Sequence, residues 1–411
     1  MKAGVRAWRG HRAPGLVLGL CGAVFLAAAL SQAESVPLPA SSNTITVTLE
    51  YQEAEEALTS WSLSVTAQSA AFQKEPDLSP SGVRRGRLDL SVIGWQPLAC
   101  IWDSGKGKLH LDLNRNEDLT DDTNGVFTAT GKSRDARYQD FAGVGLTLNT
   151  KAGPYPLLLN LNLRYYTRMY ASASLRSFYA GKVMLQGREW QLGVVDKPYG
   201  TPGSLQDASL LLRPWEARDK PFNVDSGMMD AFAFPTNLFF QARAYRVEGL
   251  CLHETNQVRY RVQLTERSVS RGDLRFTGQF IRRAILKDGP WTVVLDAPAG
   301  MVKVPVGTYG AYQIQVQKGD AGAGLDVWPA DRGINKKITV AEGAAATLAA
   351  GGPLTNSVVV TRQGNNLWFS YRLVGVGGEQ YRLLQQDRSK PPRFAVYKGD
   401  RQLASGKFEF G

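Results

Sequence analysis

Cysteine and histidine are scarce in this chain, which has 3 of each among 411 residues. So few cysteines exclude a disulfide-dense scaffold, and no Cys-x-x-Cys pair is present to hold zinc. The length allows two or three domains with ordinary hydrophobic cores, so folding does not depend on disulfides or metal. Cys100 and Cys251 lie in apolar segments. They either pair in an oxidising compartment or remain two separate buried thiols.

The sequence motifs of common enzyme classes are also absent. No Gly-x-Ser-x-Gly nucleophile elbow or phosphate-binding loop occurs, and His253-Glu254 lacks the second histidine of a metalloprotease helix. A glycosidase that uses two carboxylates remains open, because its acids need only spatial proximity. The sequence predicts no particular catalytic residue and favours a protein that is not an enzyme.

Residues 1–33 are typical of a secretory signal peptide. A basic start precedes an uncharged apolar run at 16–30, and small residues before Glu34 predict cleavage after Ala33. The apolar run is shorter than the roughly 20 residues of a membrane-spanning helix, although an uncleaved anchor remains the alternative. We therefore expect an exported protein, periplasmic, on the outer surface or secreted, with no spanning segment after cleavage.

The net charge is positive, +11 for the whole chain, and loss of the four basic residues of the signal peptide lowers it to +7. In an exported protein this charge favours an acidic polysaccharide or a lipid headgroup surface over a genome. The expected partner is a polysaccharide or another envelope protein. No nucleic-acid-binding motif occurs. The basic residues are scattered, and scattered charge also serves solubility alone.

Alternating apolar and polar residues, interrupted every five to ten positions by turn formers, predict an all-β fold of tandem β-sandwich modules. Helix is expected to be minor, with hints only at 54–58 and 208–212. Segments 182–185 and 190–194 predict a hairpin. The expected organisation is a signal peptide at 1–33, β-rich regions at 34–153 and 154–287, and an Ig-like β-sandwich at 288–411. Eight short strands are expected from Gly289 onward, the last at 407–410.

Residues 111–123 carry the one pattern with clear chemistry. Oxygen-bearing side chains recur at alternate positions and then close the segment. These candidate metal ligands are Asp112, Asn114, Asn116, Asp118, Asp121 and Asp122. Ca²⁺ takes six or more oxygen ligands, and alternate positions let a short loop converge on one ion. The pattern resembles the EF-hand loop, and more closely the dockerin and thrombospondin-type calcium loops of exported proteins, with Leu119 as the hydrophobic anchor. The resemblance implies Ca²⁺ as a structural cofactor.

Two positions depart from that pattern. Glu117 stands where the loop needs glycine for a sharp turn, and Thr123 stands where an EF-hand has its bidentate glutamate. Asp121 or Asp122 must then supply the last ligand. The alternation of residues 109–113 is that of a strand, so we expect a calcium loop within a β-hairpin. An Asp- and Asn-rich turn without metal is the alternative.

Tryptophans are the other candidate functional residues. Those in strand patterns, such as Trp95, Trp190 and Trp368, are expected in the core, whereas Trp215 and Trp328 lie in turn-rich segments. A flat aromatic side chain on the surface stacks on a sugar ring or anchors a partner, so Trp215 and Trp328 are the candidate ligand surface.

Residues 304–309 carry a second resemblance. The sequence Val-Pro-Val-Gly-Thr-Tyr, followed by an alternating strand, resembles the Pro-x-Gly-x-Tyr hairpins of carboxypeptidase regulatory-like, transthyretin-like Ig-type modules. Together with the aspartate loop, the chain resembles exported bacterial β-proteins, and this resemblance implies no particular activity. We expect a binding or structural protein of the cell envelope. The alternative is an envelope hydrolase acting on polysaccharide.

Overall fold

The computed structural model describes most of the chain from Asn43 to Phe408. The described ranges are 43–67, 71–93, 95–130, 137–150, 153–222, 224, 229–254, 257–289, 291–319, 321–327, 337–364, 366–384 and 391–408. The predicted signal peptide and Trp328 lie outside these residues. Among the residues described, no helix has the length and apolar character needed to cross a membrane.

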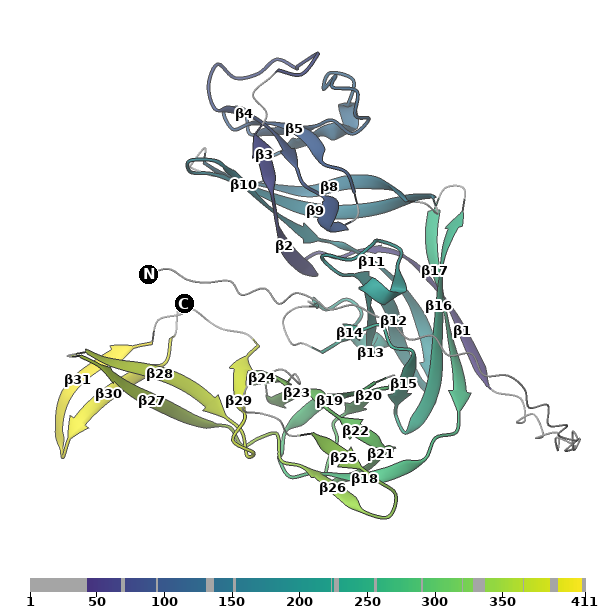
Figure 1. Cartoon of the computed structure of the whole chain (residues 1–411), viewed down its shortest axis with the longest axis vertical. Helices are drawn as coiled ribbons and strands as arrows, with labels where there is room; N and C mark the ends of the chain where they lie inside the picture. Colours follow the sequence, from purple (N-terminus) through teal and green to yellow (C-terminus); the bar gives the residue numbers. More distant parts are fainter. Residues whose placement is uncertain are drawn as a thin grey trace, which may run out of the picture. The chain divides into compact units, whose positions relative to one another are not determined.

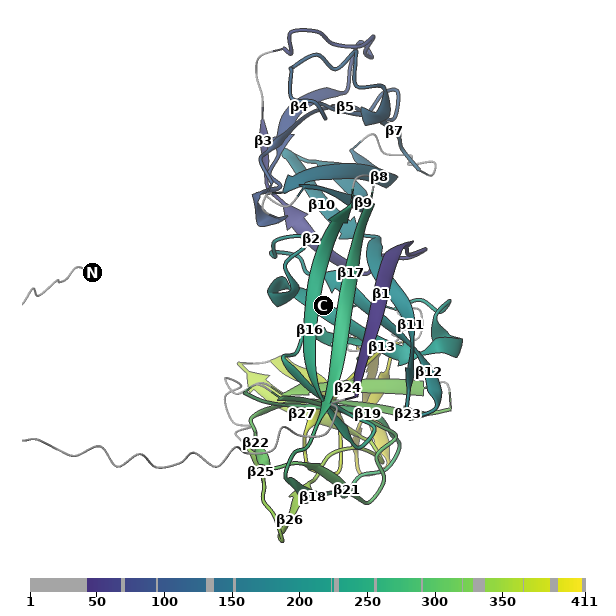
Figure 2. The same cartoon turned by 90° about the vertical axis from the view of Figure 1, so that its right-hand side faces the viewer.

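The predicted all-β fold of tandem sandwich modules is confirmed. Strands form several sheets in sandwich-like layers (Figures 1 and 2), and the helices described are four 3₁₀ turns of three residues. These turns are η1 Ser91–Ile93, η2 Thr123–Gly125, η3 Leu205–Asp207 and η4 Trp215–Ala217. Both hints of helix were wrong. Residues 54–58 form an irregular connection, and 208–212 belong to a strand buried on both faces, whose continuous apolar run carries no periodicity.

The N-terminal part contains two facing sheets, drawn in blue and purple at the top of Figure 1. One has the order β3-β4-β5-β6-β7 and the other the order β2-β10-β9-β8. The strands of the first are β3 Val65–Ala67, β4 Val83–Leu88, β5 Leu98–Asp103, β6 Lys108–Leu111 and β7 Val126–Thr128. Those of the second are β2 Thr59–Leu63, β8 Tyr138–Thr150, β9 Gly153–Tyr165 and β10 Met169–Leu175. Trp102 of β5 is fully buried and donates from Nε1 to Gln139 Oε1 of β8 at 2.7 Å, which joins the two layers.

A 15-stranded sheet connects the rest of the chain, in the order β14-β13-β12-β11-β1-β17-β16-β15-β20-β19-β23-β24-β29-β28-β27. Its strands are β1 Thr44–Glu53, β11 Ser177–Leu185, β12 Arg188–Asp196, β13 Ala208–Pro214, β14 Ala231–Ala233, β15 Asn237–Phe240, β16 Arg243–Glu254, β17 Gln257–Arg267, β19 Ile281–Asp288, β20 Trp291–Asp296, β23 Ala311–Lys318, β24 Ala321–Val327, β27 Thr355–Gln363, β28 Asn366–Val374 and β29 Gln380–Leu383. Strand β1 pairs with β17 through its first half and with β11 through its second. The predicted hairpin is confirmed as β11–β12. Its two-residue turn, Gln186-Gly187, has positive φ at both positions, which matches a type I′ turn.

Three small sheets complete the described structure: β21-β18-β26, β22-β25 and β30-β31. Their strands are β18 Arg271–Phe276, β21 Met301–Pro305, β22 Gly307–Tyr309, β25 Ile338–Val340, β26 Ala345–Leu348, β30 Arg393–Lys398 and β31 Arg401–Lys407. Of the strand predicted at 407–410, Lys407 is the last residue of β31, and residues 409–410 lie outside the described residues. Tyr309 is fully buried, and its hydroxyl donates to the carbonyl of Pro305 at 2.6 Å. This contact fixes the turn between β21 and β22.

The middle of the large sheet separates two hydrophobic cores. In β15, Leu238 and Phe240 join the core of the N-terminal half, whereas Phe239 joins the core of the C-terminal half. Strands β19 and β20 divide their residues in the same way, with Ile285 and Val294 on the first side. Alternate residues of a strand point to opposite faces, so a strand between two cores is apolar at every position.

The tryptophans expected in the core differ in how far they are buried. Trp190 of β12 is 1% exposed, as predicted, and its ring packs edge to face against Phe240. Trp368 of β28 is 59% exposed, so the prediction was wrong there. Strand β28 pairs with β27, the last strand of the large sheet, and Trp368 sits on its exposed face.

The domain boundaries predicted at residues 153 and 287 stay predictions.

Candidate cation-binding loop

The aspartate-rich loop joins β6 to β7 through residues 112–122 and the 3₁₀ turn η2. Leu119 is 2% exposed and packs with Phe72, Ala99 and Ile101, so the position predicted as a hydrophobic anchor is buried. The backbone N–H of Leu119 donates to the carbonyl of Lys74 at 3.1 Å. The loop is therefore fixed at its centre to the segment that precedes β4.

Asp112 begins the loop and organises its first turn. Its backbone N–H donates to the carbonyl of Ala99 at 3.0 Å, and its side chain is 3% exposed. Its carboxylate oxygens accept from the backbone N–H groups of Asn116 and Glu117, each at 3.2 Å. These hydrogen bonds close the first turn of the loop and hold the Asp112 side chain in place.

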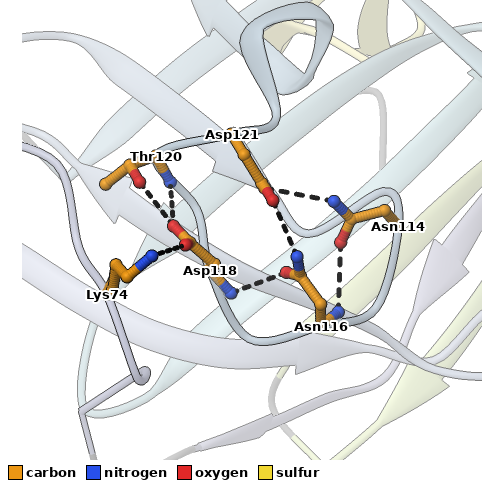
Figure 3. A network of polar contacts seen from close by, with 6 residues as sticks. All are labelled: Lys74, Asn114, Asn116, Asp118, Thr120 and Asp121. Atoms are coloured by element: carbon orange, nitrogen blue, oxygen red, sulfur yellow. Dashed lines mark hydrogen bonds and ion pairs between the residues drawn. The ribbon is translucent and has the colours of Figure 1, made fainter.

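Asn114, Asn116 and Asp121 converge in the middle of the loop (Figure 3). The side-chain amides of Asn114 and Asn116 donate to the two carboxylate oxygens of Asp121, at 3.1 Å and 2.7 Å. The Oδ1 atoms of both asparagines accept backbone N–H groups within the loop. Three of the six predicted ligands therefore lie within hydrogen-bonding distance of one another.

Asp118 points toward a different partner. Lys74 Nζ lies 2.6 Å from Asp118 Oδ2, and Thr120 donates to Oδ1 from its backbone N–H at 3.0 Å (Figure 3). The hydrogen bonds from Lys74 and then from Thr120 lower the pKa of Asp118 to about 2. The carboxylate of Asp118 is therefore already paired with the Lys74 ammonium group. Lys74 could not be predicted as a partner of Asp118, because it lies 44 residues earlier in the sequence and belongs to no local pattern.

Asp122 closes the loop and is the least satisfied of the six residues. It is 8% exposed, and its Oδ2 has no hydrogen-bond partner among the described residues. Burial raises the pKa of Asp122, and the neighbouring carboxylates of Asp112 and Asp121 raise that pKa further. Hydrogen bonds from the backbone N–H groups of Asn114 and Leu113 oppose this rise in pKa, so Oδ2 is the oxygen of this carboxylate that lacks a partner. A buried polar atom without a partner costs free energy unless a cation or hydrogen-bond donor compensates it.

The backbone adopts a left-handed conformation at two non-glycine residues of the loop. Arg115 has φ of 66° and Glu117 has φ of 61°. Glu117 therefore takes the conformation that calcium loops assign to glycine, at a cost of order 1 kcal/mol. Arg115 docks the loop on the preceding segment, since its guanidinium donates to the carbonyls of Pro97 and Gln96 at 2.9 and 3.1 Å.

The donor set of the loop suits a hard cation. Aspartate and asparagine oxygens are ligands that Ca²⁺ prefers, and the charges of Asp112 and Asp121 act on the carboxylate of Asp122. Within the described ranges, no group of three or more His, Cys, Asp or Glu side chains is arranged to hold a metal ion. A site here must therefore also use the amide oxygens of Asn114 and Asn116. The unpartnered Oδ2 of Asp122 is the observation that fits a bound cation.

Trp215 lines a pocket of about 370 Å³. The pocket is also lined by the exposed glutamates Glu53, Glu55 and Glu56, the first of which is the last residue of β1. Lys182 Nζ and the Arg218 guanidinium lie 5.2 and 5.0 Å from the centre of the Trp215 ring. Trp215 is therefore half-buried beside two cations and several carboxylates. The second predicted ligand-surface residue, Trp328, lies outside the described residues.

Both described cysteines are free. Cys100 in β5 is completely buried, and burial raises its pKa to about 12. Burial likewise raises the pKa of Cys251 in β16 to about 11, and its Sγ lies 3.5 Å from His253 Nε2. Of the alternatives left open by the sequence, the structure contains two separate thiols. Neither has the lowered pKa of a catalytic cysteine.

A polar cluster around the half-buried Asp196 could not be predicted from the sequence. Tyr155 donates to Asp196 Oδ2 at 2.7 Å, and the hydroxyls of Tyr155 and Tyr260 lie 3.1 Å apart. Burial raises the pKa of Asp196 from 3.8 to about 6, against the opposing effect of the Tyr155 hydrogen bond. These residues come from β9, β12 and β17, so no local spacing brings them together.

Comparisons with known proteins add no constraint on the site. No protein family, curated protein or solved structure matches this chain.

Proposed function

We propose that this chain is an exported, non-enzymatic binding or structural protein of the cell envelope, and that Ca²⁺ binds the loop at 112–122. The main support for the calcium site is that Asp122 is buried and has an unpartnered Oδ2, and that the charges of Asp112 and Asp121 act on its carboxylate. The signal-peptide pattern of residues 1–33 supports export.

Asp112, Asp121 and Asp122 would provide the negative charge of the site, and Asn114 and Asn116 would add neutral oxygens. Asp118 would not add net negative charge to the site, because its carboxylate forms an ion pair with Lys74. The ion would neutralise mutually repelling carboxylates and tie the loop to the buried anchor Leu119. The role is therefore stabilisation of the β6–β7 connection, and the loop needs no open coordination position for chemistry.

Calcium should raise the melting temperature of the protein relative to chelator, because a ligand that binds only the native state stabilises it. At a free Ca²⁺ concentration 100 times the Kd, the expected gain is about 2.7 kcal/mol. The Asp112→Asn variant should lose most of this gain. Asp77→Asn is the matched control, because Asp77 is exposed, pairs with Lys106 and is not one of the predicted ligands. Equal melting temperatures of the wild type in Ca²⁺ and in chelator would contradict the proposal.

The left-handed glutamate offers a second test of the loop. Glu117→Gly should stabilise the protein by about 1 kcal/mol, because glycine adopts φ near 61° without strain. Part of this gain offsets the loss of the 3.2 Å ion pair with Arg87, which is exposed and weak. Denaturant unfolding in chelator measures the effect. A loss of stability in Glu117→Gly would show that the turn is not strained.

A polysaccharide hydrolase is the second candidate function, and the pocket beside Trp215 is the observation that favours it. Glycosidases place carboxylates around a bound sugar, and this pocket contains Glu53 and Glu56 beside a tryptophan. Incubation with polygalacturonate and with dextran, followed by a reducing-end assay, separates the candidates. The binding proposal expects no release. Release that is lost in a Glu53→Gln, Glu56→Gln variant would replace it with the hydrolase.

A further inference from the structure

The outward face of the four-stranded sheet β2-β10-β9-β8 is polar along its whole width. Alternate residues of these strands, among them Trp61, Leu161 and Ala173, are buried in the core. Their neighbours along each strand point the other way and are exposed or half-buried. The face opposite the core is therefore accessible to solvent.

Cross-strand register arranges these outward residues in rows. The outward row nearest the β9–β10 turn contains Tyr170, Arg164 and Tyr138. The next row contains Ser62, Ser172, Asn162 and Asp140, and the third contains Ser60, Ser174 and Asn160. Adjacent strands lie about 4.8 Å apart, so the row of four spans roughly 14 Å of hydroxyl, amide and carboxylate groups.

Hydrogen bonds order the side chains of the face. Arg164 Nε donates to Asn162 Oδ1 at 2.7 Å, and Asn162 Nδ2 donates to Asp140 Oδ1 at 2.6 Å. The hydroxyls of Ser60 and Ser174 lie 2.7 Å apart. In this network Arg164 is exposed and forms no ion pair with any described residue, so its terminal nitrogens are available to a ligand.

Tyrosines and a second arginine extend the face at one end. Tyr138, Tyr166 and Tyr170 are 39%, 66% and 40% exposed. The guanidinium of Arg164 lies 5.1 Å from the Tyr138 ring centre, and that of Arg168 lies 4.9 Å from the Tyr170 ring centre. The rings of Tyr166 and Tyr170 are 6.1 Å apart. These cation–π contacts hold aromatic and cationic groups together on the surface.

We propose that this face, from Ser60 on β2 to Tyr138 on β8, binds an acidic polysaccharide. Rows of donors and acceptors suit sugar hydroxyls, exposed tyrosines suit sugar rings, and Arg164 and Arg168 suit the carboxylates of uronic acids. Asp140, the acidic residue within the rows, is already bonded to Asn162. The face is therefore complementary to negative charge. Its exposed aromatic residues are tyrosines, whereas insertion into a membrane calls for Trp, Phe or Leu.

This inference rests on the proposed exported binding function and names its ligand class and site. The two remain separable, because the loop at 112–122 shares no residue with this face. A calcium-dependent rise in melting temperature without glycan binding would overturn the inference and leave the calcium site intact. Glycan binding without a calcium effect would overturn the calcium site and leave the inference intact.

The test is calorimetric titration of the protein with trigalacturonate and with maltotriose, in chelator so that calcium does not bridge the glycan. We expect binding of trigalacturonate, weaker binding of the neutral maltotriose, and about a tenfold loss of trigalacturonate affinity in the Arg164→Gln, Arg168→Gln variant. Arg275→Gln, Arg372→Gln is the matched control, because it removes two exposed arginines from β18 and β28. Its affinity should equal that of the wild type.

Three results would overturn the proposal. The first is absence of binding of trigalacturonate by the wild type, and the second is equal affinity in the two double variants. The third is selective binding of phosphatidylglycerol vesicles that Arg164→Gln, Arg168→Gln abolishes, which would assign the face to a lipid surface. Unchanged melting temperatures of the variants in chelator confirm that they are folded.

A Tyr170→Ala variant tests the aromatic part of the face and keeps its charge. It should weaken trigalacturonate binding, because the sugar ring loses the tyrosine on which it stacks.

Discussion

Replacing Arg283 with methionine should lower the free energy of unfolding by about 3–5 kcal/mol. Arg283 of β19 is 4% exposed and lies on the same side of the sheet as Ile285. Its guanidinium bonds Asp296 at 2.5 Å and donates to the carbonyls of Leu212 and Met229 at 2.8 and 3.0 Å. Methionine fills a similar volume but leaves a carboxylate and two carbonyls without their partner.

Urea unfolding of Arg283→Met, compared with Arg275→Met, measures this effect. Arg275 is exposed on β18, so its replacement should change stability by no more than about 0.5 kcal/mol. Arg283→Lys should fall between the two, since a lysine keeps the charge but cannot reach all three partners at once. Equal stabilities of the two methionine variants would show that Arg283 does not join the N-terminal core to β19.

Asp196→Asn should remove a loss of stability that the wild type suffers between about pH 4 and pH 6. Part of Asp196 is solvent-accessible, but its carboxylate lies among tyrosines and accepts from Tyr155. Its pKa is about 6 in the folded protein, against 3.8 as the ordinary value. The native state therefore binds more protons than the unfolded state in this window, so stability falls as pH rises through it. The difference corresponds to about 2–3 kcal/mol.

Denaturant unfolding of both proteins at pH 4, 5, 6 and 7 gives the comparison. Other groups, including Cys251 and His253 beside the tyrosines, are present in both proteins, so the difference between the curves isolates Asp196. Asparagine still accepts from Tyr155 and loses only the 3.4 Å contact from the Gly203 N–H. We expect the free energy of unfolding of the variant to increase relative to that of the wild type as pH rises to about 6. Parallel stability curves would mean that the Asp196 carboxylate titrates normally.

The strands and the loop could be predicted from sequence because their signals are local. Alternation along a strand, as in β9, reports burial on one face, and the Gln186-Gly187 turn matches the geometry of its hairpin. Leu119 was predicted as a buried anchor from the loop pattern alone, and it is buried.

Features that depend on contacts between distant segments could not be predicted. The apolar run of β13 resembles a helix until β12 and β14 are placed on both sides of it. Strand pairing across tens of residues brings together the tyrosines around Asp196 and the rows on the outward face. Lys74 reaches Asp118 from a segment outside the strands, through an isolated β-bridge and an ion pair. The exposure of Trp368 follows from its place on the hairpin at the end of the large sheet, which its own sequence does not encode.

Calcium binding at the loop is tested most directly by calorimetric titration of the wild type beside Asp122→Asn. The account predicts one saturable Ca²⁺ site per chain in the wild type and a loss of most of that affinity in the variant. In chelator, Asp122→Asn should be at least as stable as the wild type, because it removes a negative charge beside Asp112 and Asp121 whose Oδ2 has no partner. In saturating Ca²⁺ it should be less stable than the wild type. Absence of a heat of binding, with Asp122→Asn less stable than the wild type in chelator, would contradict the calcium site.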